Sequence, residues 1–156
     1  MRILVVSDSH GNENGILEAY QAVRPVDMII HCGDGEADAW VLEAAESLPV
    51  LRVAGNCDVG SRSPRELVSE WKGKRILICH GDRYGVKTGL SFLAARGREL
   101  AADAVLFGHT HHALAETDQG LLLLNPGTLF GRASFRSCAL LEITDAGLQA
   151  TIHPLP

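Results

Sequence analysis

The sequence lacks the features that mark several large classes of protein. Its 156 residues contain no long run of lysine and arginine and carry a net charge of −5, so the chain offers no basic surface for nucleic acid. The apolar N-terminal residues 3–6 are too few for a signal peptide or a membrane span. The first apolar run leads into Asp8-Ser9-His10-Gly11 and not into a Gly-x-Gly-x-x-Gly turn, which disfavours a Rossmann-type nucleotide binder. We expect no nucleic-acid partner and no membrane partner.

Cysteine is also sparse. Cys32, Cys57, Cys79 and Cys138 form no Cys-x-x-Cys pair, so neither a disulfide framework nor a structural zinc site is expected. We therefore expect a reduced, cytoplasmic protein. With 46% hydrophobic residues, the chain is long enough to form one globular domain over residues 1–156 and to bury roughly two-thirds of its unfolded surface.

The order of the predicted elements indicates the fold class. Branched apolar runs alternate with helical patterns in the first half, where a helix with Asn12 or Asn14 as its N-terminal cap ends before Pro25. Hairpin patterns dominate the second half. This order favours an α/β (α+β) fold, in which two mixed β-sheets pack as a sandwich flanked by helices on both sides, a four-layer αββα arrangement.

Five of the apolar runs are followed by side chains that can bind a metal ion. In chain order these are Asp8 and His10, Asp34, Asn56, His80, and the pair His109 and His111. Because ligands gather outside the carboxyl ends of strands in open α/β sheets, we expect these groups on one rim. The two imidazoles of the last pair are two residues apart, so they could reach one metal ion or two adjacent ones.

Each of these residues also has an ordinary structural explanation. Asp8 and Asp34 are common cap or turn residues, Asn56 tolerates a left-handed backbone, and the histidines could be surface groups or satisfied polar groups. A single residue does not distinguish these explanations, because a short motif becomes informative only in its structural context. The recurrence at five strand ends favours a metal site.

The order of the motifs resembles a known family. Asp8-x-His10, Gly33-Asp34, Gly55-Asn56, His80-Gly81 and Gly108-His109-Thr110-His111 are similar to the calcineurin-type metallophosphoesterases, in particular to their small single-domain phosphodiesterase branch. The resemblance extends from Met1 to about Thr128. It implies that each chain binds two divalent metal ions, which could be Mn, Ni, Fe or Zn. One ion would be bound by Asp8, His10 and His111, and the other by Asn56, His80 and His109. Asp34 would bridge the two ions.

The resemblance also implies an activity. A hydroxide between the two ions would attack phosphorus in line, and a carboxylate such as Asp34 has two oxygens to share between the ions. Asp34, Asn56 and His80 would then serve catalysis directly. The implied partner is a small phosphodiester substrate, and the implied assembly is a homodimer or homotetramer. The alternative is a member of the same fold that has lost activity and serves as a scaffold for protein assembly; the complete set of seven ligands favours the enzyme.

One position departs from the wider superfamily, many members of which have a histidine after Gly-Asn that is placed to protonate the leaving group or stabilise the transition state. Here the residue is Cys57, and a thiol is a weak hydrogen-bond donor with an ordinary pKa of about 8.5. That substitution fits diesters with good leaving groups better than alkyl monoesters. Asp58 could assist, although we interpret it as a solvated loop carboxylate.

Three further features lie near these motifs. Arg83 and Arg132 are candidates for phosphate contact, or else solvated surface charges. The segment Asn125-Pro126-Gly127-Thr128 predicts a structural turn near the rim. The remaining histidines, His31, His112 and His153, are placed outside the site.

Overall fold

A computed structural model describes residues 1–156, and it confirms the predicted sandwich. The first sheet has the order β10-β9-β1-β2-β3, in which β1, β2 and β3 are parallel and β9 and β10 are antiparallel to their neighbours. Its strands are β1 (Arg2–Val6), β2 (Met28–His31), β3 (Val50–Arg52), β9 (Arg136–Thr144) and β10 (Gly147–Leu155).

The second sheet has the order β4-β5-β6-β8-β7. Its three inner strands are parallel, and the edge strands β4 and β7 are antiparallel to their neighbours. The strands are β4 (Glu66–Trp71), β5 (Lys74–Cys79), β6 (Ala104–Leu106), β7 (Leu114–Asp118) and β8 (Leu121–Asn125). The sheet is thus mixed, with the parallel strands that lead to His80 and His109 at its centre.

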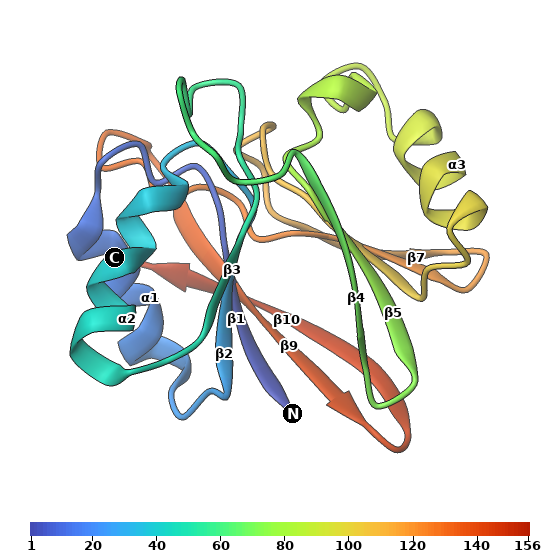
Figure 1. Ribbon diagram of the computed structural model, residues 1–156, viewed down its shortest axis with the longest axis horizontal. Helices are drawn as coiled ribbons and strands as arrows, with labels where there is room; N and C mark the ends of the chain where they lie inside the picture. The colour runs from blue at the N-terminus through green and yellow to red at the C-terminus, as the bar shows by residue number, and fades with distance from the viewer.

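Helices cover the outer face of each sheet. Figure 1 shows α1 (Glu13–Val23) and α2 (Trp40–Glu46) beside the first sheet and α3 (Ser91–Glu99) beside the second. Two short 3-10 helices, η1 (Glu36–Ala39) and η2 (Asp82–Tyr84), follow the loops after β2 and β5. Of the two predicted caps for α1, the structure uses Asn12, whose side chain accepts a hydrogen bond from the Gly15 backbone N–H. No helix is both long and apolar enough to cross a membrane.

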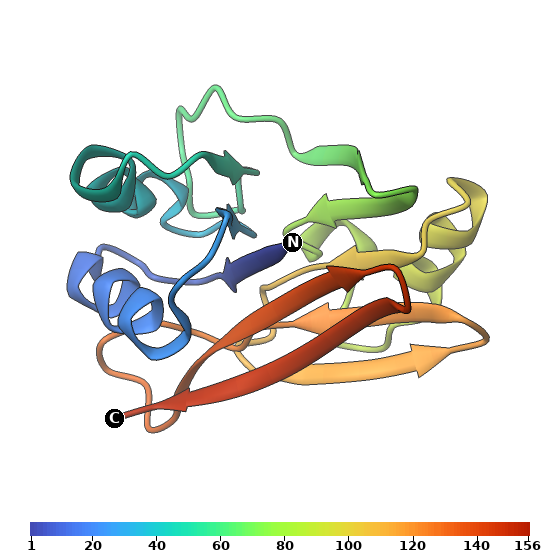
Figure 2. The same cartoon turned by 90° about the horizontal axis from the view of Figure 1, so that it is seen from below.

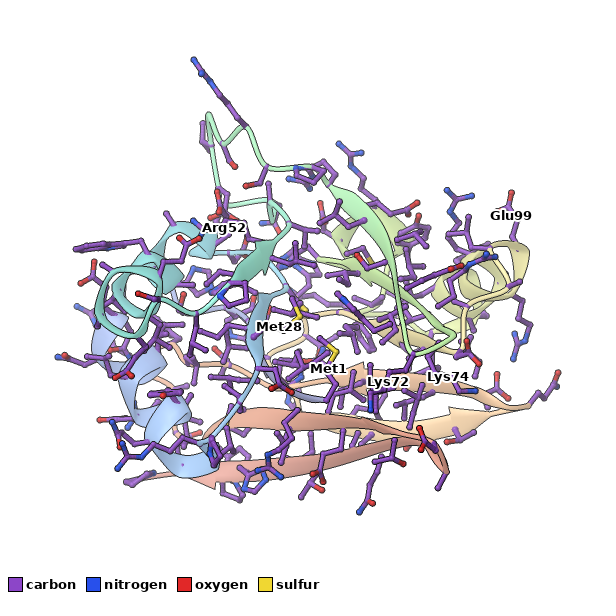
Figure 3. All side chains as sticks on the ribbon, turned by 60° about the horizontal axis from the view of Figure 1, so that its bottom comes forward. Met1, Met28, Arg52, Lys72, Lys74 and Glu99 are labelled. Atoms are coloured by element: carbon purple, nitrogen blue, oxygen red, sulfur yellow. The ribbon has the colours of Figure 1, made fainter.

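Alternating side chains bury both faces of β1. Ile3 and Val5 pack between the two sheets, whereas Leu4 and Val6 pack against the helices on the outer side. Full burial of each such side chain contributes about 1.5–3 kcal/mol, so the strand is held firmly on both faces. Figure 3 shows Met1 and Met28 between the sheets, where β1 and β2 begin. The carboxyl ends of these strands therefore emerge at the opposite end of the sandwich.

Candidate metal centre

The carboxyl ends of parallel strands from both sheets meet on one rim. The loops after β3 and β5 rise from the same upper edge of the molecule in Figure 1, and Figure 2 views the two sheets from the opposite, lower end. Backbone hydrogen bonds join these loops across strands, as in the Gly108 N–H donating to the His80 carbonyl at 3.0 Å. Each predicted ligand lies in a loop that follows one of five strands, β1, β2, β3, β5 or β6.

The backbone at the predicted ligands is in a rare conformation. Five of the seven predicted ligands have positive φ: Asp8 (53°), His10 (46°), Asp34 (57°), His109 (68°) and His111 (61°). A non-glycine residue in this region costs on the order of 1–3 kcal/mol, and such residues cluster at functional sites. Five of the nine non-glycine residues with positive φ thus lie where the candidate ligands converge.

Two glycines allow the loops to come close. A Cβ atom on Gly55 would lie 2.1 Å from Asp34 Oδ1, and a Cβ atom on Gly108 would lie 1.9 Å from Ser7 Oγ. Both distances are far below van der Waals contact, so any side chain at either position would push the loops apart. The glycines in Gly55-Asn56 and Gly108-His109 are therefore needed for packing.

The first group of ligand atoms surrounds an unpaired carboxylate oxygen. Asp8 Oδ1 is 3.1 Å from His111 Nε2 and 3.9 Å from His10 Nε2, and the two imidazole nitrogens are 3.4 Å apart. Oδ1 is buried and takes part in no well-formed hydrogen bond, whereas Oδ2 accepts from Ser7 Oγ at 2.6 Å and from the His109 N–H at 3.0 Å. A buried oxygen without a partner is costly, and a cation between Asp8, His10 and His111 would satisfy it.

The second group surrounds His80 Nε2. The ring's Nδ1 is 2.8 Å from the Cys32 carbonyl, so Nδ1 carries the proton and Nε2 presents a lone pair. Nε2 lies 3.2 Å from Asn56 Oδ1, 3.2 Å from His109 Nδ1 and 3.4 Å from Asp34 Oδ2. The Asn56 and Asp34 oxygens and His80 Nε2 present lone pairs toward one another, and His109 Nδ1 does the same when the proton is on its other ring nitrogen. A cation at their centre would satisfy all four atoms.

Asp34 lies between the two groups and faces both with a single oxygen. Its Oδ2 is 4.0 Å from His10 Nε2 and 3.4 Å from His80 Nε2. Its Oδ1 accepts a hydrogen bond from the Cys57 backbone N–H at 2.7 Å. The sequence suggested that Asp34 has two oxygens to share between the two ions. In the structure, Oδ2 is the oxygen that faces both groups of ligand atoms.

The local charges favour a cation. Burial opposes ionisation of Asp34, but the proximity of His80 and the hydrogen bond from the Cys57 backbone outweigh burial and hold the pKa of Asp34 well below the usual range. The pKa of Asp8 is also lowered, since the proximity of His111 and the charge on His80 outweigh burial. Burial also opposes a charge on His80, but the neighbouring Asp34 and Asp8 outweigh burial and raise the pKa of His80. In contrast, burial and the neighbouring His80 lower the pKa of His109. The rim therefore holds carboxylates that stay ionised beside imidazole nitrogens, a set of donors that suits Mn, Fe, Ni or Zn.

Cys57 faces the same rim. The Sγ atom lies in a third group of potential ligands with His10 and Asp34, whose ligand atoms are all within 4.8 Å of one another. Partial burial and the adjacent Asp34 carboxylate raise the pKa of the Cys57 thiol, so it stays protonated near neutral pH.

The interpretation of Asp58 as a solvated loop carboxylate is wrong. Its Oδ2 accepts from the backbone N–H groups of Asp34 and Gly55, each at 2.7 Å. Its Oδ1 accepts from those of Gly35 at 2.7 Å and Glu36 at 3.4 Å. Asp58 thus fastens the loop that carries Asp34 to the loop that carries Asn56. Only the folded chain brings these four donors together.

Residues 125–128 form a turn closed by a side chain, in which Asn125 Oδ1 accepts from the Gly127 N–H at 2.9 Å, and they support the rim. Asn125 Nδ2 donates to the Gly108 carbonyl at 2.9 Å, and Thr128 Oγ1 donates to the Asp8 carbonyl at 2.8 Å. Sequence reasoning missed Phe130, whose ring contacts that of His10 edge-on with the centroids 5.4 Å apart. No local pattern could have shown that contact, because 120 residues separate the two rings.

The structure does not bring the two candidate phosphate-binding arginines to the ligands. Arg83 and Arg132 are both exposed, and neither forms a hydrogen bond or ion pair with a candidate ligand. Arg83 lies in η2, and Arg132 lies in the loop between β8 and β9. Their contact with phosphate stays a prediction. The three histidines placed outside the site, His31, His112 and His153, belong to none of the groups of potential ligands.

Comparisons with known proteins agree with this geometry. Residues 1–146 match the model of the calcineurin-like phosphoesterase superfamily domain. The chain is 38% identical over 132 residues to the probable metallophosphoesterase YsnB of Bacillus subtilis, a match that covers 83% of this chain and 75% of the relative. It is 27% identical over 146 residues to the phosphodiesterase MJ0936 of Methanocaldococcus jannaschii, with 84% and 86% covered.

Two solved structures share the fold. A predicted phosphoesterase from Streptococcus pneumoniae superposes with a TM-score of 0.82 at 29% identity and covers 98% of this chain and 88% of its own. The Vps29 protein of Entamoeba histolytica complexed with Zn²⁺ superposes with a TM-score of 0.74 at 21% identity, with 99% of each chain covered. The second likeness concerns the fold alone.

Proposed function

The chain belongs to the calcineurin-like phosphoesterase superfamily, and on this premise we propose that it hydrolyses phosphodiesters with two divalent metal ions bound at the rim. Asp8, His10 and His111 would hold one ion, and Asn56, His80 and His109 the other, with Asp34 between them. The observation that carries the proposal is the unpaired Asp8 Oδ1 among imidazole nitrogens, next to a second group centred on His80 Nε2. MJ0936, a relative named as a phosphodiesterase, supports the class of substrate.

The bound ions would supply an activated water molecule and neutralise charge on the phosphate. The contribution of the chain is orientation: the Cys32 carbonyl fixes the His80 ring, and Asp58 holds the loop of Asp34. The Cys57 thiol, with its raised pKa, is a poor proton donor to a leaving group. Substrates with leaving groups that depart as stable anions therefore fit this rim best.

The test uses metal-stripped protein and bis(4-nitrophenyl) phosphate. Because such ions stabilise the transition state by several kcal/mol, Mn²⁺ or Ni²⁺ should raise turnover by about 100-fold or more. His111→Ala should remove most of this gain, whereas His153→Ala should not, since His153 lies in β10 and belongs to none of the groups of potential ligands. Turnover that no metal stimulates would contradict the proposal.

The alternative function is a scaffold for protein assembly. The structural likeness to Vps29 proteins supports this alternative, because the name of one of them is vacuolar protein sorting 29. The Vps29 of Entamoeba histolytica was solved with Zn²⁺. Metal binding alone therefore does not separate the two functions. A chain that binds two ions yet hydrolyses neither monoesters nor diesters would be the scaffold.

Three finer points belong to the same proposal. Mn, Ni, Fe or Zn are the proposed ions, which elemental analysis of purified protein would identify. The cytoplasm is the proposed compartment, since all four cysteines are unpaired. A homodimer or homotetramer is the proposed assembly, and light scattering on the eluting protein would measure its mass.

A further inference from the structure

A cavity of about 640 Å³ opens next to the first group of ligands. Its walls come from three parts of the chain: the loop after β6, the loop between β8 and β9, and β10. In Figure 1 the orange loop between β8 and β9 lies beside the dark blue loop that carries Asp8 and His10. Backbone hydrogen bonds hold these loops together, including the Leu129 N–H donating to the Ser7 carbonyl at 3.2 Å.

The cavity is continuous with the candidate metal centre through two of its walls. The His111 side chain lines the cavity, and its Nε2 is the atom 3.1 Å from Asp8 Oδ1. Thr128 also lines the cavity and donates its hydroxyl to the Asp8 carbonyl. A phosphorus atom held at the Asp8 group therefore has the cavity directly beside it.

The walls combine apolar and uncharged polar side chains with two histidines. Ala113, Ala133, Phe135 and Ile152 form the apolar part, and the other four lining residues are His111, His112, Thr128 and Ser134. None of the eight is Asp, Glu, Lys or Arg. Phe135 is 56% exposed, which leaves an aromatic face open toward the cavity and solvent. Exposed apolar surface beside a polar centre is typical of a small-molecule site, and the volume lies within the usual range of roughly 300–1,000 Å³ for such sites.

The only other strongly exposed phenylalanine provides a contrast. Phe92 is 75% exposed on α3 and lines a cavity with Arg83, Arg96 and Glu99. That cavity contains charged side chains and none of the candidate ligands. Unlike that cavity, the cavity beside His111 adjoins the candidate metal centre and has no Asp, Glu, Lys or Arg in its walls, which suits an uncharged group attached to a phosphate at the metal centre.

We infer that the cavity beside His111 binds an uncharged, apolar ester group of the substrate, preferably one with an aromatic ring, and so selects phosphoesters with such a group over those with a small or charged group. The inference rests on the proposed function for the position of the phosphate. It names Phe135 as the residue that determines specificity, through the face that it presents to a bound ring.

The test uses three phosphonates that the protein cannot hydrolyse: phenylphosphonate, methylphosphonate and 2-aminoethylphosphonate. Each places one group on phosphorus, so their inhibition constants against bis(4-nitrophenyl) phosphate compare that group alone. Since even one methylene in an apolar pocket changes discrimination by about tenfold or more, phenylphosphonate should inhibit at least tenfold more tightly than the other two. Phe135→Ala should reduce that ratio severalfold, and Phe92→Ala should leave it unchanged.

A second variant and a second measurement guard against misfolding and against a failure of catalysis. Ala133→Phe should fill the cavity and abolish the preference for phenylphosphonate. Backbone amide shifts in metal-free protein should move for Ala133, Ser134 and Phe135 on addition of phenylphosphonate, and should not move on addition of methylphosphonate. If these amide signals move but the protein hydrolyses no ester, the proposed function is refuted and the inferred binding site is supported. Hydrolysis with equal inhibition by all three phosphonates, or with the same ratio in the Phe135 and Ala133 variants, would overturn the inference.

Discussion

Replacement of Asp58 by asparagine tests how the rim is built. The Asp58 carboxylate accepts four backbone hydrogen bonds, two on each oxygen. Asparagine would keep one oxygen and turn an NH2 group toward two N–H donors, so at least two bonds to a charged acceptor would be lost. At about 1.5–3 kcal/mol for each such bond, the loss is about 3–6 kcal/mol, and water that enters this half-buried loop reduces it toward the lower value.

The expected result is therefore a decrease of about 3 kcal/mol in the free energy of unfolding, which urea titration followed by tryptophan fluorescence would measure. Because the loops of Asp34 and Asn56 lose their shared anchor, Mn²⁺ affinity by calorimetry should also fall, by about 10- to 100-fold. Asp145→Asn in the exposed β9–β10 turn is the matched control. A variant at position 58 that unfolds at the wild-type urea concentration and binds Mn²⁺ as tightly would refute the reasoning.

The other predictions concern single residues. Asp34→Ala should lower metal content at both positions, whereas His111→Ala should lower it mainly at one; equal stoichiometry in the two variants would contradict the assignment. Burial lowers the pKa of His31 to about 4, below the unfolded value of about 6.5, so the unfolded state binds more protons between these pH values. The free energy of unfolding should thus fall by about 2 kcal/mol from pH 7 to pH 5 through this group, and His31→Gln should flatten that slope in urea titrations at the two pH values. Cys57→His should raise hydrolysis of an alkyl monoester such as glycerol 2-phosphate by about 100-fold, with little change for 4-nitrophenyl esters; a uniform change in both would argue against a missing proton donor.

The features that follow from strand ends could be predicted from the sequence. Branched apolar runs mark the inner strands, and a polar group after each run belongs on a shared rim because parallel strands place their carboxyl ends together. This reasoning found Asp8, Asp34 and His80, whose side chains the structure brings to one rim. The turn at 125–128 was predictable for a similar reason, since proline and glycine restrict its backbone.

The features that depend on contacts between distant loops could not be predicted. The four donors to Asp58 come from two loops, so a loop position alone suggested a solvated carboxylate. Asp34 faces both groups of ligands with Oδ2 while its Oδ1 accepts a hydrogen bond from the Cys57 N–H. That hydrogen bond joins the loops after β2 and β3, two strands that pair in the folded sheet. The apolar cavity requires Ala113, Phe135 and Ile152 from three separate elements, and no spacing in the sequence relates them.

Anomalous diffraction from a crystal of the protein grown with Mn²⁺ tests the central claim most directly. We expect two manganese peaks on the rim, one beside Asp8, His10 and His111 and one beside Asn56, His80 and His109, with Asp34 between them. A single peak, or manganese bound elsewhere while these side chains keep their present contacts, would contradict it.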